Sequence, residues 1–210
     1  MRGHGCAVGR TIAALLVLLG WGVAPSAAQL LDFIAVRVGS RVITWSHVLQ
    51  EAEVQRVEKG AEAQPSALRV RDELLRRELL YAEAERLRLT VDAESAAHQA
   101  AVLVAAWGEA EWESLARYGV GRAQVAERVR RQLVAEQFLS FRREMTFVPE
   151  RDVRAAYATE AEDFGGRPLD EVRDEVRARL AESAFQRELE QWIERKIAEG
   201  GVVVNPIPEG

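Results

Sequence analysis

The sequence predicts a mostly α-helical protein that carries one small β-sheet. Three observations support this fold class. Apolar residues recur every three or four positions through most of the chain after residue 46. Two β-favouring runs, 33–38 and 41–44, flank Gly39-Ser40. A short valine run, Val202–Val204, follows the last helical pattern.

The first 28 residues have the features of a secretory signal peptide. Arg2 and Arg10 make a basic start, residues 12–23 form an apolar run, and Ser26-Ala27-Ala28 matches a cleavage site. The run is shorter than the roughly 20 residues that a membrane-spanning helix needs. We therefore expect cleavage after Ala28, a periplasmic location and no stable membrane insertion afterwards. The alternative is an uncleaved N-terminal anchor.

The composition excludes several kinds of chemistry. Cys6 is the single cysteine and precedes the predicted cleavage point, so the released chain has no thiol for disulfides, catalysis or metal binding. The formal net charge of −5 argues against nucleic-acid binding, which needs clustered basic charge. His47 and His98 belong to no metal-binding or catalytic motif, and no phosphate-binding motif occurs. We expect no catalytic residue, no metal and no cofactor.

The two ends of the released chain are predicted to meet in one sheet. Residues 33–38 and 41–44 have the spacing of a tight hairpin around Gly39-Ser40. Ser46 is then predicted to cap a helix that stops near Lys59-Gly60. Residues 202–204 form a run too short to be stable alone, and the hairpin is the obvious partner for them.

Three helices are predicted in the middle of the chain, over residues 66–87, 92–107 and 109–118. Asp92 is a plausible N-cap of the second of these helices, because its carboxylate can accept a hydrogen bond from an unpaired amide of the first turn. Gly108 and Gly119 follow the second and third helical patterns, where glycine commonly ends a helix.

Three further helices are predicted after Gly121. Pro149 starts the second of them, residues 150–160, and Pro168 starts the third after a flexible joint at residues 163–166. The helix between Gly121 and Pro149 has an apolar stripe of helical period formed by Val134, Phe138, Phe141 and Met145.

The helix that follows Pro168 has two apolar stripes offset by five positions, so its two halves should pack on different surfaces. The first stripe is Leu169, Val172, Val176 and Leu180, and the second is Phe185, Leu189, Trp192 and Ile193.

This order of elements resembles the SurA family of periplasmic chaperones. The likeness covers Leu31–Asn205 and is carried by residues 35–44 with the following helix, by 74–92, by 148–157, and by 188–194 with 202–204. It implies a SurA N-like helical chaperone domain, residues 29–164, and a C-terminal helix and strand, residues 165–210, that complete the same module. Typical relatives insert parvulin isomerase domains before the last helix, whereas only four residues separate Phe164 from Leu169 here.

The resemblance implies an ATP-independent holdase that binds unfolded polypeptides, above all outer-membrane proteins. Six apolar side chains are candidates for client contact, although each is also a candidate core residue: Trp107, Trp112, Phe138, Phe141, Met145 and Tyr157. Two alternatives stay open, a prolyl isomerase of the parvulin family with an unrecognised site and a non-catalytic adaptor with one dedicated partner or a second copy of the chain. Mixed charge runs at residues 69–73 and 182–190 are interpreted as solvated helix faces.

Overall fold

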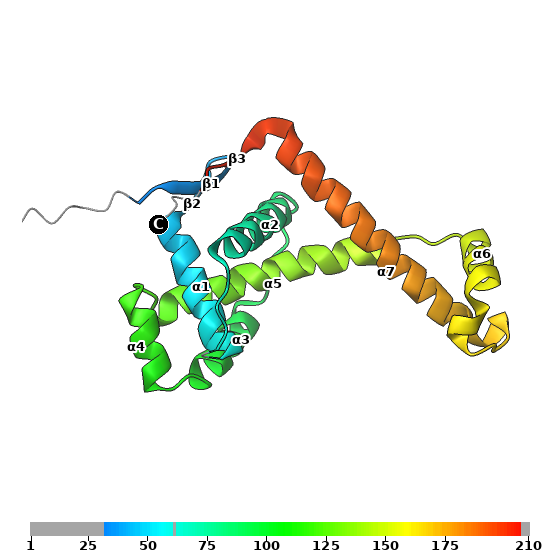
Figure 1. Cartoon of the computed structure of the whole chain (residues 1–210), viewed down its shortest axis with the longest axis horizontal. Helices are drawn as coiled ribbons and strands as arrows, with labels where there is room; N and C mark the ends of the chain where they lie inside the picture. Colours follow the sequence, from blue (N-terminus) through cyan, green and yellow to red (C-terminus); the bar gives the residue numbers. More distant parts are fainter. Residues whose placement is uncertain (1–31, 61, 207–210) are drawn as a thin grey trace, which may run out of the picture. The chain divides into compact units, whose positions relative to one another are not determined.

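The computed structural model describes residues 32–60 and 62–206, and these belong to one compact unit. They form seven α-helices and one three-stranded antiparallel sheet (Figure 1). The predicted fold class, mostly α with a small sheet, is confirmed. The predicted signal peptide, residues 1–28, lies outside the described residues.

The sheet joins the two ends of the described chain. Its strands are β1 (Ile34–Val38), β2 (Arg41–Thr44) and β3 (Val202–Val204), in the order β2-β1-β3. Both pairings are antiparallel, and the Asn205 side-chain amide donates to the Ile34 carbonyl at 2.7 Å beyond the end of β3. Gly39, with φ of 59°, allows the tight turn between β1 and β2. The predicted pairing of the valine run with the hairpin is therefore confirmed.

The helices follow the predicted order. They are α1 (Trp45–Lys59), α2 (Ala67–Arg86), α3 (Ala93–Ala105), α4 (Glu109–Arg117), α5 (Arg122–Glu144), α6 (Glu150–Glu160) and α7 (Leu169–Lys196). A 3-10 turn, Ala161–Phe164, connects α6 to α7 where a flexible joint was expected, and Phe164 is buried there. A wider helical turn, Ile197–Gly201, leads from α7 into β3.

The start of α1 corrects one prediction. Thr44, and not Ser46, is the N-cap, because the chain leaves its extended conformation at Thr44 and Trp45 is already helical. The Thr44 hydroxyl accepts from the His47 amide at 3.5 Å, and the Thr44 amide donates to His47 Nδ1 at 3.3 Å. The Ser46 amide donates instead to Asp32 at 3.0 Å.

The other predicted cap is confirmed. The Asp92 carboxylate accepts a hydrogen bond from the Ser95 amide at 2.7 Å and starts α3 one residue later. This helix ends at Ala105, two residues before its predicted end at Trp107. The Trp107 indole packs against Trp112 of α4.

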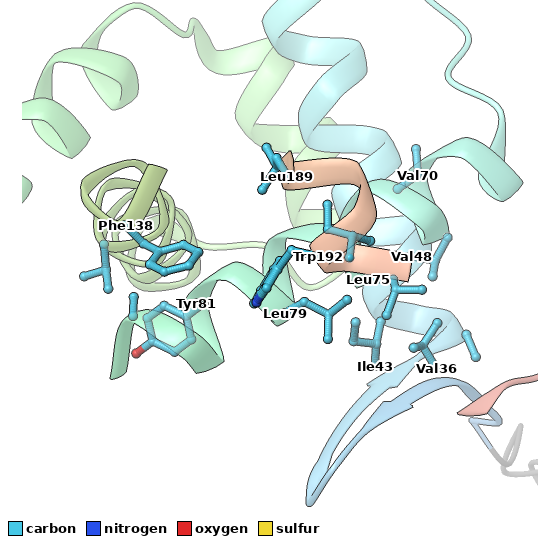
Figure 2. Close-up of a cluster of buried hydrophobic side chains, with 14 of the residues drawn as sticks. Val36, Ile43, Val48, Val70, Leu75, Leu79, Tyr81, Phe138, Leu189 and Trp192 are labelled. Atoms are coloured by element: carbon cyan, nitrogen blue, oxygen red, sulfur yellow. The ribbon is translucent and has the colours of Figure 1, made fainter. Parts of the chain in front are cut away.

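Buried side chains form three clusters. The main core joins the sheet, α1, α2, α5 and the second half of α7, and includes Phe138 beside Trp192 (Figure 2). The tryptophan cluster surrounds Leu115 and includes Trp107 and Trp112. The α6–α7 cluster comprises Val153, Phe164, Val172 and Val176, with Leu169 and Leu180 at its margin. The two halves of α7 thus pack on different surfaces, as its offset stripes predict.

Candidate client-binding surfaces

The structure distributes the six predicted client-contacting residues over different clusters. Trp107 and Trp112 are half-buried and pack edge to face, with ring centroids 5.3 Å apart. Tyr157 is half-buried in the α6–α7 cluster, and its hydroxyl donates to the Arg167 carbonyl at 2.6 Å. These three rings stabilise local packing and leave only part of their surface to a client.

Phe138 belongs to the main core. Its side chain is 2% exposed and its ring centroid lies 5.5 Å from that of Trp192 on α7 (Figure 2). Since no surface of this ring is open to a client, the interpretation of Phe138 as a contact residue is corrected to a core residue that fixes α5 against α7.

Phe141 and Met145 are exposed, and a third apolar residue follows them. The exposed fractions are 41% for Phe141, 68% for Met145 and 82% for Phe147. We call these three residues the apolar row. Sequence reasoning missed Phe147 because it lies beyond the end of α5, where helical periodicity carries no information. The signal available was a large aromatic residue directly before Val148-Pro149, where the helix had to stop.

A second surface is a groove of about 490 Å³ lined by β2, α1, α2 and α5. It combines apolar and charged side chains, a composition that ligand-binding clefts commonly have. The apolar side chains of the groove are Val42, Ile43, Val54, Leu74, Val120 and Val125. The charged ones are Arg41, Glu51, Arg77, Glu78, Glu127, Arg128 and Arg131. Within the described chain, β2 is an edge strand that pairs on one side only.

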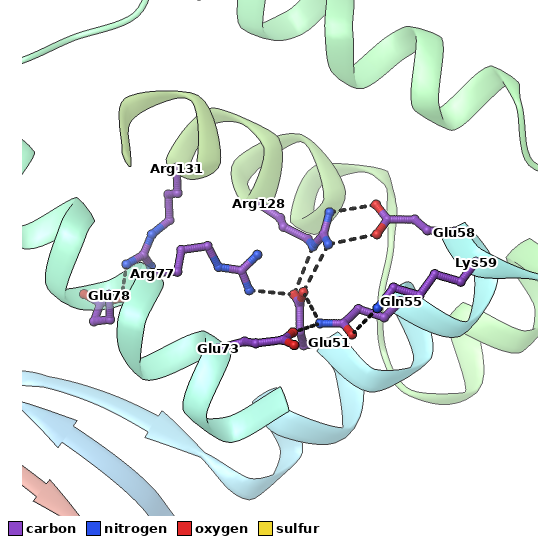
Figure 3. Close-up of polar contacts among 9 residues, drawn as sticks. All are labelled: Glu51, Gln55, Glu58, Lys59, Glu73, Arg77, Glu78, Arg128 and Arg131. Carbon is purple, nitrogen blue, oxygen red and sulfur yellow. Dashed lines mark hydrogen bonds and ion pairs between the residues drawn. The ribbon is translucent and has the colours of Figure 1, made fainter. Parts of the chain in front are cut away.

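Glu51 of α1 is the centre of an ion-pair network in this groove (Figure 3). Its side chain is 7% exposed. Arg128 of α5 donates to the two carboxylate oxygens of Glu51 at 2.9 and 3.0 Å, and Arg77 of α2 contacts Glu51 at 2.9 Å. Arg128 also donates twice to Glu58, at 2.8 and 3.0 Å. The network therefore links three helices around the groove.

The two arginines of the network, Arg77 and Arg128, balance the two glutamates, Glu51 and Glu58, and their positive charges lower the pKa of Glu51. Burial alone would raise this pKa, but the hydrogen bonds and positive charges of Arg128 and Arg77 outweigh burial and hold it below its usual value. For Arg128, burial lowers the pKa, and the bonds to Glu51 and Glu58 more than reverse this effect. Both groups are charged at neutral pH.

A second set of arginines surrounds Tyr81 near the end of the groove. Glu78 accepts from Arg41 at 3.0 Å and also from Arg131. The guanidinium carbon of Arg131 lies 4.3 Å from the Tyr81 ring centroid, and Arg130 donates to the Tyr81 hydroxyl at 2.8 Å. These contacts hold Arg131 and Arg41 in place at the groove wall.

Neither a metal-binding cluster nor a membrane-spanning helix is found among the described residues. Over residues 32–60 and 62–206, no group of three or more His, Cys, Asp and Glu side chains is arranged to hold a metal ion. Within the same ranges, none of the helices has the length and apolar character needed to cross a membrane. His47 is engaged in the α1 cap, and His98 is exposed on α3.

The sequence was compared with protein families and with curated proteins. No protein-family model matches the sequence, and no curated protein matches it. The function is therefore inferred from the two surfaces described above.

Proposed function

We propose that this protein is an ATP-independent holdase of the SurA type, which binds unfolded polypeptides, above all outer-membrane proteins, in the bacterial periplasm. The apolar row carries this proposal, because Met145 and Phe147 are the two most exposed large apolar side chains of the described residues, and Phe141 lies within the same seven positions. Burial of apolar area is favourable and non-directional, so such a surface can bind many different sequences.

The apolar row is presented by a helix that is held firmly in place. Phe138, three residues before Phe141, is packed in the main core, and Arg143 of α5 pairs with Glu182 of α7 at 3.0 Å. Phe141 and Met145 are four positions apart and lie on one helix face. Phe147 follows in the connection to α6, where its side chain can adapt to different clients.

Further support comes from the order of elements. A SurA-type module without its parvulin domain would need the last strand to complete the N-terminal sheet, and β3 pairs with β1. The predicted signal peptide, residues 1–28, supports the periplasmic location.

An aggregation assay tests the proposal. A denatured outer-membrane protein is diluted into buffer with residues 29–210 of this chain, which contain every described element, and light scattering is followed without ATP. We expect slower aggregation with the unchanged chain and loss of most of this effect in the triple variant Phe141→Ser, Met145→Ser, Phe147→Ser. The matched control is Leu68→Ser with Val102→Ser, which removes exposed apolar side chains, 52% and 59% exposed, outside the apolar row.

The assay can also reject the proposal. No protection by the unchanged chain at several-fold molar excess contradicts holdase function, and equal loss in the control variant contradicts a role for the apolar row. Crosslinking in cells to one stoichiometric protein would favour the adaptor instead. Acceleration of prolyl-peptide isomerisation, which takes tens of seconds or longer without a catalyst, would favour the isomerase.

A further inference from the structure

We infer that the groove selects extended polypeptide segments that carry a carboxylate beside apolar residues, and that Arg77 holds this carboxylate. The inference rests on the proposed function, since the segment belongs to a client. It adds a chemical preference that the apolar row cannot supply, because apolar contact does not distinguish an acidic neighbour from a basic one.

The acceptor capacity of Glu51 is already used. An ionised carboxylate offers about four acceptor positions. At Glu51 these are met by Arg77, by two nitrogens of Arg128, and by the Gln55 side-chain amide at 3.4 Å. A basic group of a client would therefore have to displace a guanidinium to reach Glu51.

The donor capacity of Arg77 is largely unused. A guanidinium has five N–H donors in a planar fork that fits a carboxylate. Arg128 makes four hydrogen bonds, whereas Glu51 is the only ion-pair partner of Arg77 within the described residues (Figure 3). The Arg77 side chain lines the groove and is 23% exposed. Its remaining N–H groups can donate to a client carboxylate, which becomes the second partner of Arg77.

The charge balance of the groove acts in the same direction. Arg41 and Arg131 share Glu78, just as Arg77 and Arg128 share Glu51. Arg128 and Arg41 each have a second partner, Glu58 and Glu85, whereas Arg77 has, among the described residues, only the glutamate that it shares with Arg128. A carboxylate that approaches Arg77 thus meets a guanidinium whose charge is only partly compensated, which favours acidic over basic segments.

The shape of the groove favours an extended segment. Val42 and Ile43 of the edge strand β2 form part of its lining. An extended chain can add to such an edge through main-chain hydrogen bonds, while alternate side chains enter the groove. A segment with a valine two positions before and two positions after one glutamate has all three side chains on one face. It would place apolar side chains near Leu74 and Val125 and its carboxylate at Arg77.

Peptide binding tests this inference. Fluorescence anisotropy is measured for residues 29–210 with labelled Ser-Thr-Val-Thr-Glu-Thr-Val-Thr-Ser, in which both valines and the glutamate lie on one face, and with versions carrying Gln or Lys at the central position. We expect the Glu peptide to bind about tenfold more tightly than the Gln peptide, the change expected for one charge-assisted hydrogen bond, and the Lys peptide to bind most weakly. Added salt should reduce the preference for Glu.

Two variants assign the preference to Arg77. Arg77→Gln should abolish the difference between Glu and Gln peptides, and Arg77→Lys should retain only part of it because the planar fork is lost. The matched control is Arg69→Gln, which removes the same charge from an exposed position of α2 outside the groove. Urea unfolding of each variant verifies that it is folded.

The outcomes separate this inference from the proposed function. Equal binding of the three peptides, or an unchanged preference in folded Arg77→Gln, overturns the inference even if the chain still suppresses aggregation. Absence of any peptide binding, with aggregation suppression intact, also overturns it. Loss of aggregation suppression in the unchanged chain is the separate result that rejects holdase function.

Discussion

Replacing Arg128 with methionine should destabilise the fold strongly, because this side chain links α5 to α1. The substitution keeps most of the apolar stem and removes all four hydrogen bonds that the guanidinium makes to Glu51 and Glu58. Glu51, at 7% exposed, would keep only Arg77 and Gln55 as partners. Its carboxylate would then be buried with part of its charge uncompensated.

The size of the expected loss in the free energy of unfolding follows from how deeply the carboxylates of Glu51 and Glu58 are buried. Removing one partner of a buried ion pair costs about 3–5 kcal/mol, and the remaining Arg77 contact places the expected loss near the lower end, at about 3 kcal/mol. Glu58 is 24% exposed and adds less than about 1 kcal/mol. With a urea m-value of about 2 kcal/mol/M, the unfolding midpoint should fall by roughly 1.5 M.

A double-mutant cycle provides the assay. Replacing Arg128 and Glu51 together with methionine removes both charges of the buried pair, and a well-packed apolar pair is often as stable as a buried ion pair. Arg77 loses its partner in this variant, but its side chain is 23% exposed and keeps access to water. We expect the double variant to lie within about 1 kcal/mol of the unchanged chain in urea unfolding, so that Glu51→Met rescues Arg128→Met. If Arg128→Met changes the free energy of unfolding by less than about 1 kcal/mol, or if the double variant is as unstable as the single one, the reasoning is refuted.

Three further predictions concern stability. The pKa of Glu51 is lowered in the folded chain. The contribution of Glu51 to the free energy of unfolding should therefore be complete above its ordinary pKa of 4.5, and should be lost as the pH falls through the lower folded value. Urea midpoints measured from pH 7 to pH 3 should drop at the acid end, and should drop less steeply in Glu51→Met. Asp92→Ala should cost about 1 kcal/mol because the Ser95 amide loses its acceptor, whereas Asp92→Asn should be nearly neutral, as thermal unfolding can check. Arg88→Gly should raise stability by about 0.5 kcal/mol, because Arg88 has φ of 58°, a conformation in which glycine is not strained; a lower melting temperature would contradict this.

Features determined by local chemistry could be predicted from the sequence. The bounds of α6 agree with the prediction, because Pro149 before it fixes the start of a helix. Asp92 caps α3 because its short side chain can accept a hydrogen bond from an amide of the first turn. The return of β3 to β1 follows from the instability of a lone short strand, which leaves the N-terminal hairpin as its partner.

Features that depend on distant partners could not be predicted. Glu51 and Arg128 are 77 positions apart, so no local pattern pairs them. A weak signal was present, since Glu51 lies three residues from both Val48 and Val54 on the buried side of α1. The mixed charges of residues 69–73 and 182–190, which are predicted to be solvated helix surface, are exposed or half-buried, whereas Glu51 and Glu78 lie outside these runs and are buried. Burial of such charges becomes clear only when the helices are packed together.

The sheet that closes the molecule imposes an order on its assembly. Asn205 and Ile34, which contact each other beside β1, are separated by 171 positions. A ribosome makes the β1–β2 hairpin first, so one side of β1 stays without a neighbour until almost the whole chain has been synthesised. Contacts this far apart in sequence slow folding, because the intervening chain must be brought together first. Completion of this sheet should therefore be among the last folding steps, and a nascent chain stalled before Val202 would expose a β1 edge that can pair with other chains.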